Sequence, residues 1–111
     1  MKIMISQPMN GKTDEEILKV RKNIIKKLNI NEKDVIDSWV ADDKIGDPIQ
    51  MLGMSIEKMA EADMIVFAEG WYNARGCKIE YQTAIEYKKP IINMQALAVT
   101  NNEKEEEKQN V

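Results

Sequence analysis

Short apolar runs alternate along the chain with longer segments in which apolar residues recur every three or four positions. The short runs predict four strands, at residues 2–5, 34–39, 64–68 and 90–94. The longer segments predict three helices, at residues 14–30, 48–62 and 77–87. The run "MIVFA" at 64–68 is apolar throughout, as is typical of a central parallel strand. Strands that alternate with helices predict a parallel sheet that is covered on both faces.

The expected helix ends carry recognisable signals. Thr13 followed by Glu16 is a capping box, and Asn31 is the expected left-handed stop of the first helix. Asp47 and Pro48 suit the N-cap and the first residue of the second helix. The apolar residues at helical spacing are Ile17, Val20, Ile24 and Leu28 in the first helix, Leu52, Ile56, Met59 and Ala60 in the second, and Cys77, Tyr81, Ala84 and Ile85 in the third.

The expected order of the strands locates a ligand site. With right-handed crossovers, such strands most simply take the order 2-1-3-4, in a Rossmann-like (flavodoxin-like) three-layer α/β sandwich with four or five parallel strands. The order reverses between the first and third strands, and ligands in such sheets bind outside the carboxyl ends of the strands at that reversal. Two segments flank this position: a first loop, residues 6–13, and a second loop, residues 69–76.

The length and composition of the chain narrow the class of protein. Its 111 residues suit one domain, expected over residues 1–99, followed by a charged tail at 100–111 that is expected to fray. The net charge is −3 with basic and acidic residues intermixed, which argues against a nucleic-acid partner. No apolar run approaches the roughly 18 residues of a membrane span, and no apolar signal segment precedes the first strand. The single cysteine fits a reducing compartment, so a cytoplasmic protein is expected.

The absence of histidine narrows the chemistry. It excludes Ser-His-Asp and Cys-His catalysis, and it removes the commonest ligand of transition metals. One cysteine is also too few for a cysteine-rich zinc site, so no metal is expected. Acid–base or nucleophilic work must therefore fall to carboxylates, Cys77, lysine or tyrosine.

The segment "SQPMNGKTDEE" at 6–16, which contains the first loop, lies one residue away from a phosphate-binding P-loop pattern. Ser6 stands where that pattern needs its first glycine, and Pro8 removes a backbone N–H donor. The acidic residues at 14–16 would oppose a triphosphate, and the third strand ends in Glu69 rather than in an aspartate placed for Mg²⁺. The segment Gly11–Thr13 therefore indicates a turn and a helix cap, and the P-loop interpretation is rejected.

Glu80 is the first candidate for chemistry. A third helix that begins near Cys77 places Glu80 in its first turn, near the carboxyl edge of the sheet and beside the expected buried residues. The helix dipole and the free N–H groups of a first turn favour an ionised carboxylate. Such a carboxylate next to a sugar is what a glycosyl-transfer nucleophile requires. The alternative is a surface glutamate that helps the helix to begin, and the spacing alone leaves both interpretations open.

Other side chains in and beside the second loop have two interpretations each. Cys77, close to Arg75 at a helix N-terminus, could be a reactive thiolate, although a small packed residue is the preferred interpretation. Trp71 and Tyr72 could stack on a nucleobase or fill a subunit interface. Arg75 could bind a phosphate or cap carbonyl groups of the loop.

Three stretches carry a resemblance to a known family. These are "MISQPMNGKTDEEI" (4–17), "VIDSW" (35–39) and "EADMIVFAEGWYNARGCKIEYQTAIEYKKPII" (61–92). With them, the chain from its first residue to the end of the predicted fourth strand resembles the small nucleoside 2-deoxyribosyltransferase-like proteins of bacteria and their phages. The resemblance implies a Rossmann-like fold, a homo-oligomer, and cleavage of the N-glycosidic bond of a deoxynucleoside or its 5′-monophosphate, with no metal and no redox cofactor.

The resemblance also implies roles for single residues. Glu80 would be the nucleophile that attacks the anomeric carbon, and water or a second base would then take the sugar from the deoxyribosyl-enzyme. The implied substrate-binding residues are Ser6, Gln7, Asn10 and Gly11 in the first loop, and Gly70, Trp71, Arg75 and Gly76 in the second.

One departure from the family pattern bears on activity. Relatives usually have an aspartate on the second helix that helps to protonate the leaving base, and Ser55 occupies that position here. Serine is a poor general acid, and loss of such an acid typically costs about 10²–10⁴-fold in rate. Asp37 or Glu69 could replace it, and Asp37 and Ser55 are counted with the substrate-binding residues.

Two functions without catalysis stay open beside the enzyme. A protein with Ser55 at the acid position could bind a nucleotide-type ligand in the same crevice without turnover, as a sensor or a sequestering protein. Alternatively, Trp39, Trp71 and Tyr72 could face another chain in an oligomeric interaction module.

Overall fold

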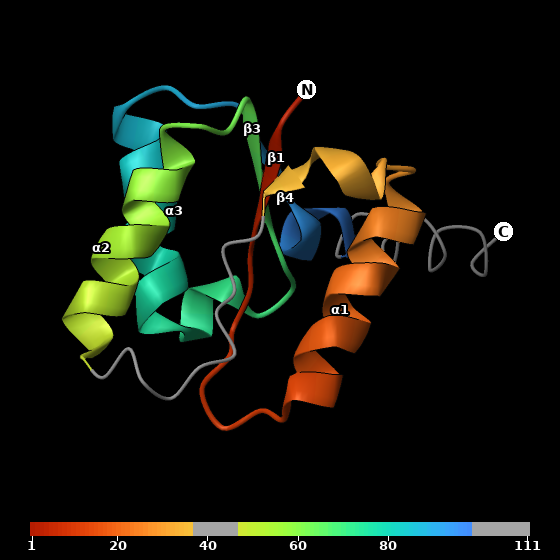
Figure 1. Cartoon of the computed structure of the whole chain (residues 1–111), viewed down its shortest axis with the longest axis horizontal. Helices are drawn as coiled ribbons and strands as arrows, with labels where there is room; N and C mark the ends of the chain where they lie inside the picture. Colours follow the sequence, from red (N-terminus) through yellow and green to blue (C-terminus); the bar gives the residue numbers. More distant parts are fainter. Residues whose placement is uncertain (37–46, 99–111) are drawn as a thin grey trace, which may run out of the picture.

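The computed structural model of the chain describes residues 1–36 and 47–98, in which strands and helices alternate (Figure 1). The strands are β1 (Ile3–Ser6), β2 (Val35–Ile36), β3 (Met64–Phe67) and β4 (Ile91–Asn93). The longer helices are α1 (Asp14–Lys27), α2 (Pro48–Met59) and α3 (Arg75–Glu86). Two 3-10 turns, η1 (Glu32–Asp34) and η2 (Trp71–Asn73), precede β2 and α3, and residues 94–98 are helical.

The four strands form one parallel sheet in the order β2-β1-β3-β4, which confirms the predicted order. β1 pairs with β3 along its whole length, and Ser6 lies opposite Phe67 where both strands end. Because the strands are parallel, their carboxyl ends lie at one edge of the sheet. The order reverses between β1 and β3, so the predicted position of a ligand site is present in the fold.

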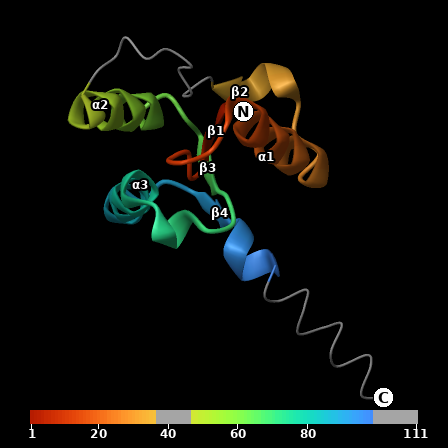
Figure 2. The ribbon, with the colours of Figure 1, turned by 90° about the horizontal axis from the view of Figure 1, so that it is seen from below.

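The sheet is the middle of three layers, as predicted. Figure 2 shows α1 on one side of the sheet and α2 with α3 on the other. Side chains of a strand point alternately to its two faces, and β1 follows this rule. Ile3 and Ile5 pack in a cluster with Ile24 of α1, whereas Met4 packs in a second cluster with Ala84 of α3. The next residue with the orientation of Met4 is Ser6, at the carboxyl end of the strand.

The most buried large side chains belong to the two central strands. They are Met4, Ile65, Val66 and Phe67, and each is almost completely removed from solvent. Burial of a side chain of this size contributes about 1.5–3 kcal/mol to stability. The central strands are therefore firmly anchored, and they fix the points at which the first and second loops leave the sheet.

The predicted starts of α1 and α2 are confirmed. Thr13 Oγ1 accepts a hydrogen bond from the Glu16 N–H (3.1 Å), and the Glu16 carboxylate accepts one from the Thr13 N–H (3.3 Å), which completes the capping box. Asp47 caps α2 by accepting a hydrogen bond from the Ile49 N–H (2.8 Å), with Pro48 as the first helical residue. Both helices thus begin where short polar side chains satisfy free backbone N–H groups.

The predicted stop of α1 at Asn31 is wrong. Asn29 is the residue with left-handed backbone geometry (φ +54°), and the Ile30 N–H donates back to the Ile25 carbonyl (2.9 Å). This helix-ending pattern brings two apolar side chains together, and Ile25 and Ile30 both pack against the core that faces α1. Asn31 instead caps η1 by accepting a hydrogen bond from the Lys33 N–H (3.0 Å).

The predicted end of the second helix is also wrong. α2 ends at Met59 rather than near Ala62, and Ala60 is exposed rather than inward-facing. The chain leaves the helix here because β3 begins only a few residues later. The Lys89 ammonium group stabilises this turn by donating to the carbonyls of Ala60 (3.4 Å) and Ala62 (2.7 Å).

The third helix is longer than predicted, and its buried face is formed by partly different residues. α3 begins at Arg75, so the last two residues of the second loop are helical. Its buried positions are Cys77, Glu80 and Ala84, spaced three and four residues apart, whereas Ile85 is 48% exposed and was wrongly placed in the core. A helix advances by about 100° per residue, so a stripe centred on these three positions turns Ile85 away from the sheet.

Some sequence predictions fall outside the described residues. The strand predicted at 34–39 is present at its start, as β2, and residues 37–46 are not described. The predicted tail at 100–111 also lies outside the described part. Within residues 1–36 and 47–98, none of the helices is both long and apolar enough to cross a bilayer.

Gly70 has a left-handed backbone (φ +80°), and we expect its replacement by alanine to destabilise the protein by about 1–2 kcal/mol. A Cβ there would meet Pro8 only at 3.9 Å, so the cost comes from the backbone rather than from a clash. Gly53 in α2 is the matched control, because a Cβ there meets nothing within 4 Å. Alanine at this helical position should stabilise by about 0.5–1 kcal/mol. Urea denaturation of both variants measures the two changes in the free energy of unfolding. Changes of the same sign in both variants would contradict the prediction.

Candidate functional site

Ser6 is the residue of β1 that enters the candidate site. It ends the strand, shares the face of Met4 towards α2 and α3, and is only 3% exposed. Its hydroxyl makes no hydrogen bond of regular geometry with any described residue, yet it lies close enough to Glu80 and Cys77 to lower the pKa of both. A buried hydroxyl of this kind is rare, because burial removes its water partners.

Glu80 lies in the buried stripe of α3, with only 7% of the residue exposed. The Ser55 hydroxyl of α2 donates a hydrogen bond to Glu80 Oε1 (2.8 Å). The two helices pack closely here, because a Cβ on Gly76 would lie 3.9 Å from a methyl group of Leu52. The carboxylate is therefore held between α2 and the end of β1, close to the position where the strand order reverses.

Burial raises the pKa of Glu80 above the ordinary glutamate value of 4.5, and the hydroxyls of Ser6 and Ser55 lower it by a smaller amount. The expectation that a helix N-terminus would favour the ionised form is wrong. Because α3 begins at Arg75, Glu80 lies in the second turn, beyond the free N–H groups of the first. Among the described groups, only the two serine hydroxyls offset the free-energy cost of burying the ionised carboxylate.

Cys77 is a packed residue rather than a reactive thiolate, in line with the preferred interpretation. It is buried, and the pKa of its thiol is raised to about 11, chiefly by burial. The Ser6 hydroxyl opposes this rise in pKa, and the Glu80 carboxylate adds a smaller increase. At neutral pH the thiol is protonated. It supplies neither a nucleophile nor a negative charge to the site.

Trp71 packs within its own chain. Its indole stacks on Tyr81 with ring centres 4.1 Å apart and an angle of 13° between the planes. The indole Nε1–H donates to the Asn93 side-chain carbonyl (3.0 Å), and Phe67 meets Tyr81 edge-on (5.0 Å). One face of the indole is therefore covered by Tyr81. Whether Trp71 or the half-exposed Tyr72 contacts a nucleobase or another subunit stays a prediction.

The second loop is also tied to the segment after β4, which sequence reasoning missed. The Gly70 N–H donates to the Gln95 side-chain carbonyl (3.0 Å). The Asn93 side-chain carbonyl that accepts from Trp71 accepts a second hydrogen bond from the Ala96 N–H (3.1 Å). The available signal was the placement of two amide side chains, Asn93 and Gln95, at the end of the fourth predicted strand, at the carboxyl edge of the sheet.

The rest of the first loop is not brought to Glu80. Gln7 is buried on the other side, where its Nε2 donates to the Ile17 carbonyl of α1 (3.0 Å) and its Oε1 has no hydrogen-bond partner among the described residues. Asn10 and Gly11 lie in an exposed turn, in which Gly11 has φ +77°. Of the four predicted residues of this loop, the structure therefore groups only Ser6 with the carboxylate.

The remaining predicted residues are scattered around the site. Arg75 is exposed at the first position of α3 and makes no hydrogen bond or ion pair with the described residues. Glu69 is also exposed, and Asp37 lies outside the described residues. No second carboxylate among the described residues is hydrogen-bonded to Glu80, whose partner is Ser55.

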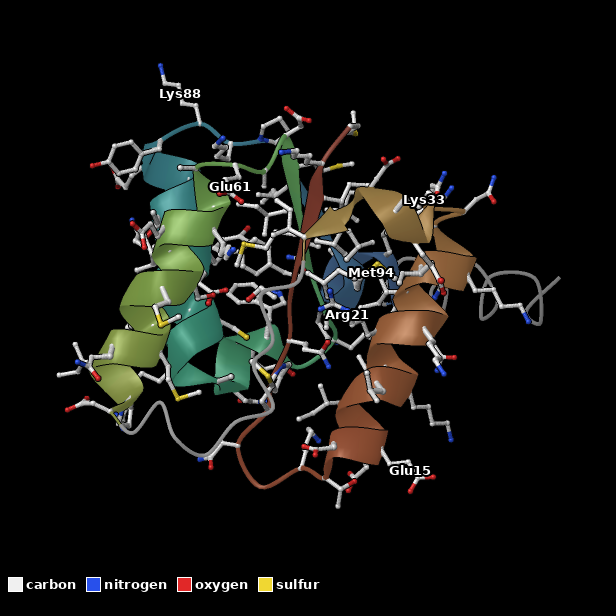
Figure 3. The ribbon with its side chains drawn as sticks, in the orientation of Figure 1. Glu15, Arg21, Lys33, Glu61, Lys88 and Met94 are labelled. Carbon is white, nitrogen blue, oxygen red and sulfur yellow. The ribbon has the colours of Figure 1, made fainter. Side chains whose placement is uncertain are left out.

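The charged side chains of α1 belong to the layer on the other side of the sheet from Glu80. Figure 3 shows Arg21 directed from α1 towards the sheet, whereas Glu15 of the same helix points away from it. The Arg21 guanidinium donates to the Ile36 carbonyl at the end of β2 (3.1 Å). A depression of about 340 Å³ on the outer face of α1 is lined by residues of that helix alone and lies in the layer opposite to Glu80. No cluster of three or more potential metal ligands occurs in the described part of the chain.

Replacing Asn93 by alanine should destabilise the protein by about 1–3 kcal/mol. The change leaves the half-buried indole N–H of Trp71 without an acceptor and removes the cap of the helical segment at 94–98. Asn23→Ala, on the exposed face of α1, is the control and should change stability by less than about 0.5 kcal/mol. Thermal and urea denaturation followed by circular dichroism measure both. An Asn93 variant as stable as the control would show that this contact contributes nothing.

Residues 1–93 match a protein family, DUF4406, which is described as a domain of unknown function. The match covers every strand and the three longer helices described above. Comparison with curated proteins and with solved structures gave no match. The family description names no deoxyribosyltransferase, so the activity that the resemblance implies stays a prediction.

Proposed function

The chain belongs to the DUF4406 family, a domain of unknown function, and we propose that it cleaves or transfers at the N-glycosidic bond of a deoxynucleoside or a deoxynucleoside 5′-monophosphate. One observation carries the proposal. Glu80 is a buried carboxylate, hydrogen-bonded to Ser55 and without a cationic partner among the described residues, beside the end of β1. Buried carboxylates with perturbed pKa values near a sheet's carboxyl edge are typical of catalytic groups.

The chemistry follows from the properties of this carboxylate. A Glu80 oxygen attacks C1′ of the deoxyribose, the C1′–N bond breaks, and its electron pair leaves with the base. Water or a second base then attacks C1′ and releases the carboxylate. Because Ser55 occupies Oε1, Oε2 is the oxygen available for attack. The reaction needs no redox cofactor, since carbon is neither oxidised nor reduced overall, and the attacking group is a carboxylate that is already nucleophilic when ionised.

The leaving base receives little help from the described residues that contact Glu80. The Ser55 hydroxyl is committed to Glu80, and a hydroxyl is too weak an acid to protonate a leaving base. The rate of cleavage should therefore increase steeply as the pKa of the leaving group falls, because a group of low pKa departs without a proton. An enzyme that protonates the leaving base would show a weaker dependence, so an experiment can distinguish the two mechanisms.

The test incubates the protein with each deoxynucleoside, each 5′-monophosphate and 4-nitrophenyl 2-deoxyriboside. The nitrophenolate group of the last substrate leaves without protonation. This substrate should therefore react at least about 10²-fold faster than any natural deoxynucleoside, because a general acid typically accelerates such a step by at least this factor. Release of base and of nitrophenolate is followed by chromatography and absorbance. Absence of turnover with all of these substrates would refute the enzymatic function.

The second candidate is a nucleotide-type ligand binder without turnover, favoured by the serine that contacts Glu80 in place of an acid. It predicts a rise in melting temperature with a deoxynucleotide that is afterwards recovered intact. It also predicts that the activated nitrophenyl substrate stays intact. Conversion of either compound would exclude the pure binder.

A homo-oligomer is part of the proposal. Apolar side chains of α2 support it, because Ile49 is 79% exposed and Met51 and Met54 are also well exposed among the described residues. Sedimentation of the protein and of an Ile49→Lys variant tests this. If both proteins sedimented as monomers, the proposed homo-oligomer would be refuted.

A further inference from the structure

Three elements converge on the Glu80 carboxylate. β1 contributes Ser6, α2 contributes Ser55, and α3 contributes Glu80 itself together with Cys77. Cys77 is the titratable group that faces Glu80, whereas β1 and α2 present hydroxyls there. No described lysine or arginine is among the groups that act on this carboxylate. A buried carboxylate without a cation must be satisfied by neutral donors.

Ser55 is one such donor, with its hydroxyl 2.8 Å from Oε1. It reaches Glu80 because α2 and α3 pack closely near Gly76 and Leu52. Its backbone lies in the middle of a helix, which limits the serine side chain to a few rotamers. The bond orients the plane of the carboxylate.

Ser6 is the second hydroxyl beside Glu80. Its hydroxyl is buried, has one proton to donate, and lies near both Cys77 and Glu80. The Cys77 thiol keeps its own proton at neutral pH, so it needs none from Ser6. The Ser6 hydroxyl makes no hydrogen bond of regular geometry with the described residues, so its proton is available to the carboxylate.

We propose that Ser6 and Ser55 act together as positioning residues that hold the Glu80 carboxylate ready for attack, in the place where other carboxylate sites use a cation. As a statement about catalysis this inference rests on the proposed function. Hydroxyls have an advantage over lysine or arginine here. They donate hydrogen bonds to the carboxylate without neutralising its charge, so the nucleophile keeps its negative charge while its geometry is fixed.

The experiment measures the pKa of Glu80 directly, from the side-chain carboxyl carbon signal in ¹³C-labelled protein, assigned by its absence in Glu80→Gln. Ser55→Ala and Ser6→Ala should each raise this pKa, because each removes a donor that favours the ionised form. Ser55→Thr keeps the hydroxyl and should restore the wild-type value. Thr83→Val is the matched control, since Thr83 donates within α3 to the Ile79 carbonyl and not to Glu80.

Activity gives the second measurement. The ascending limb of kcat/KM against pH should move to higher pH in both alanine variants, and the plateau should fall about 10-fold or more for Ser55→Ala, the effect of one charge-assisted hydrogen bond. An unchanged Glu80 pKa in both alanine variants would overturn the role of the serines. If no substrate turns over, the carbon signal still decides this point, so failure of the serine pair and failure of the proposed function are distinguishable.

Discussion

Replacing Glu80 by glutamine is expected to lower kcat/KM for deoxyriboside cleavage by about 10³-fold or more. Glutamine keeps the size of the side chain and can still accept a hydrogen bond from Ser55, but its amide cannot form a glycosyl ester. The variant should therefore bind substrate with a nearly unchanged Kd while the chemical step is lost. Binding measured by calorimetry and turnover of the nitrophenyl substrate separate the two quantities.

The control for this prediction is Glu86→Gln on the same helix. Glu86 is exposed and accepts a hydrogen bond only from Gln82 (2.9 Å) among the described residues, so its replacement should leave kcat/KM within about twofold. Rapid acid quenching followed by mass spectrometry should find a deoxyribosyl ester on wild-type protein and none on Glu80→Gln. Equal turnover by Glu80→Gln and wild type would refute the role of this carboxylate.

The pH dependence of the reaction gives an independent view of the same group. Attack requires the ionised carboxylate, and burial raises its pKa above 4.5. The activity should therefore rise with pH along a limb that lies above this value. A limb at or below 4.5 would mean that the reacting carboxylate is not the buried one.

The fold was predictable from the sequence because its signals are local. The apolar run at 64–68 and the caps at Thr13 and Asp47 each depend on neighbouring residues, and right-handed connection of such units then leaves one simple strand order. The boundaries were less predictable. Asn29 rather than Asn31 ends α1, because the choice depends on which following apolar residue reaches the core.

The site was predictable only in part. The position of Glu80 near the carboxyl edge of the sheet was predicted, while its role as nucleophile stays a prediction. The alternation of β1 could also have shown that Ser6 shares the orientation of Met4. The sequence led to the wrong ionisation argument because the helix was expected to begin at Cys77. The charge state of Glu80 depends on burial between α2 and β1, and burial is set by contacts between residues far apart in the chain.

Contacts that hold the second loop were beyond single-sequence reasoning. The amide side chains of Asn93 and Gln95 bind Trp71 and Gly70 across more than twenty positions of sequence. Nothing in the spacing of those residues specifies the pairing. It emerges only when β4 lies beside β3 and the carboxyl ends of both strands meet at one edge.

Glu80→Gln should also make the folded protein more stable at neutral pH. The pKa of Glu80 is higher in the folded state than the ordinary value that applies to the unfolded chain. Its contribution to stability is therefore fully present below about pH 4.5 and is lost as the pH rises through the folded-state pKa. Above that pH, folding buries a charge that the unfolded chain keeps in water. Glutamine has no charge to bury and avoids this cost.

The expected gain at pH 7 is about 0.5–2 kcal/mol, a range common for substitutions that relieve a functional site, and it corresponds to a rise in Tm of about 2–8 °C for a domain of this size. The difference between the variant and wild type should shrink as the pH falls towards 4.5. Cys77 does not interfere, because a thiol with a pKa of about 11 stays protonated throughout this range. Glu86→Gln, which removes an exposed carboxylate from the same helix, should show no such pH-dependent gain.

Loss of activity and gain of stability from one substitution would together identify Glu80 as a group kept for function at the expense of the fold. A structural carboxylate gives the opposite pattern, because its removal destabilises the protein and leaves substrate turnover untouched. Scanning calorimetry of wild type, Glu80→Gln and Glu86→Gln between pH 4 and pH 8 distinguishes these cases. If the Glu80 variant were less stable than wild type at pH 7, the ionised carboxylate would have to be well solvated or paired in the folded state. The physical reason for assigning it to catalysis would then be gone.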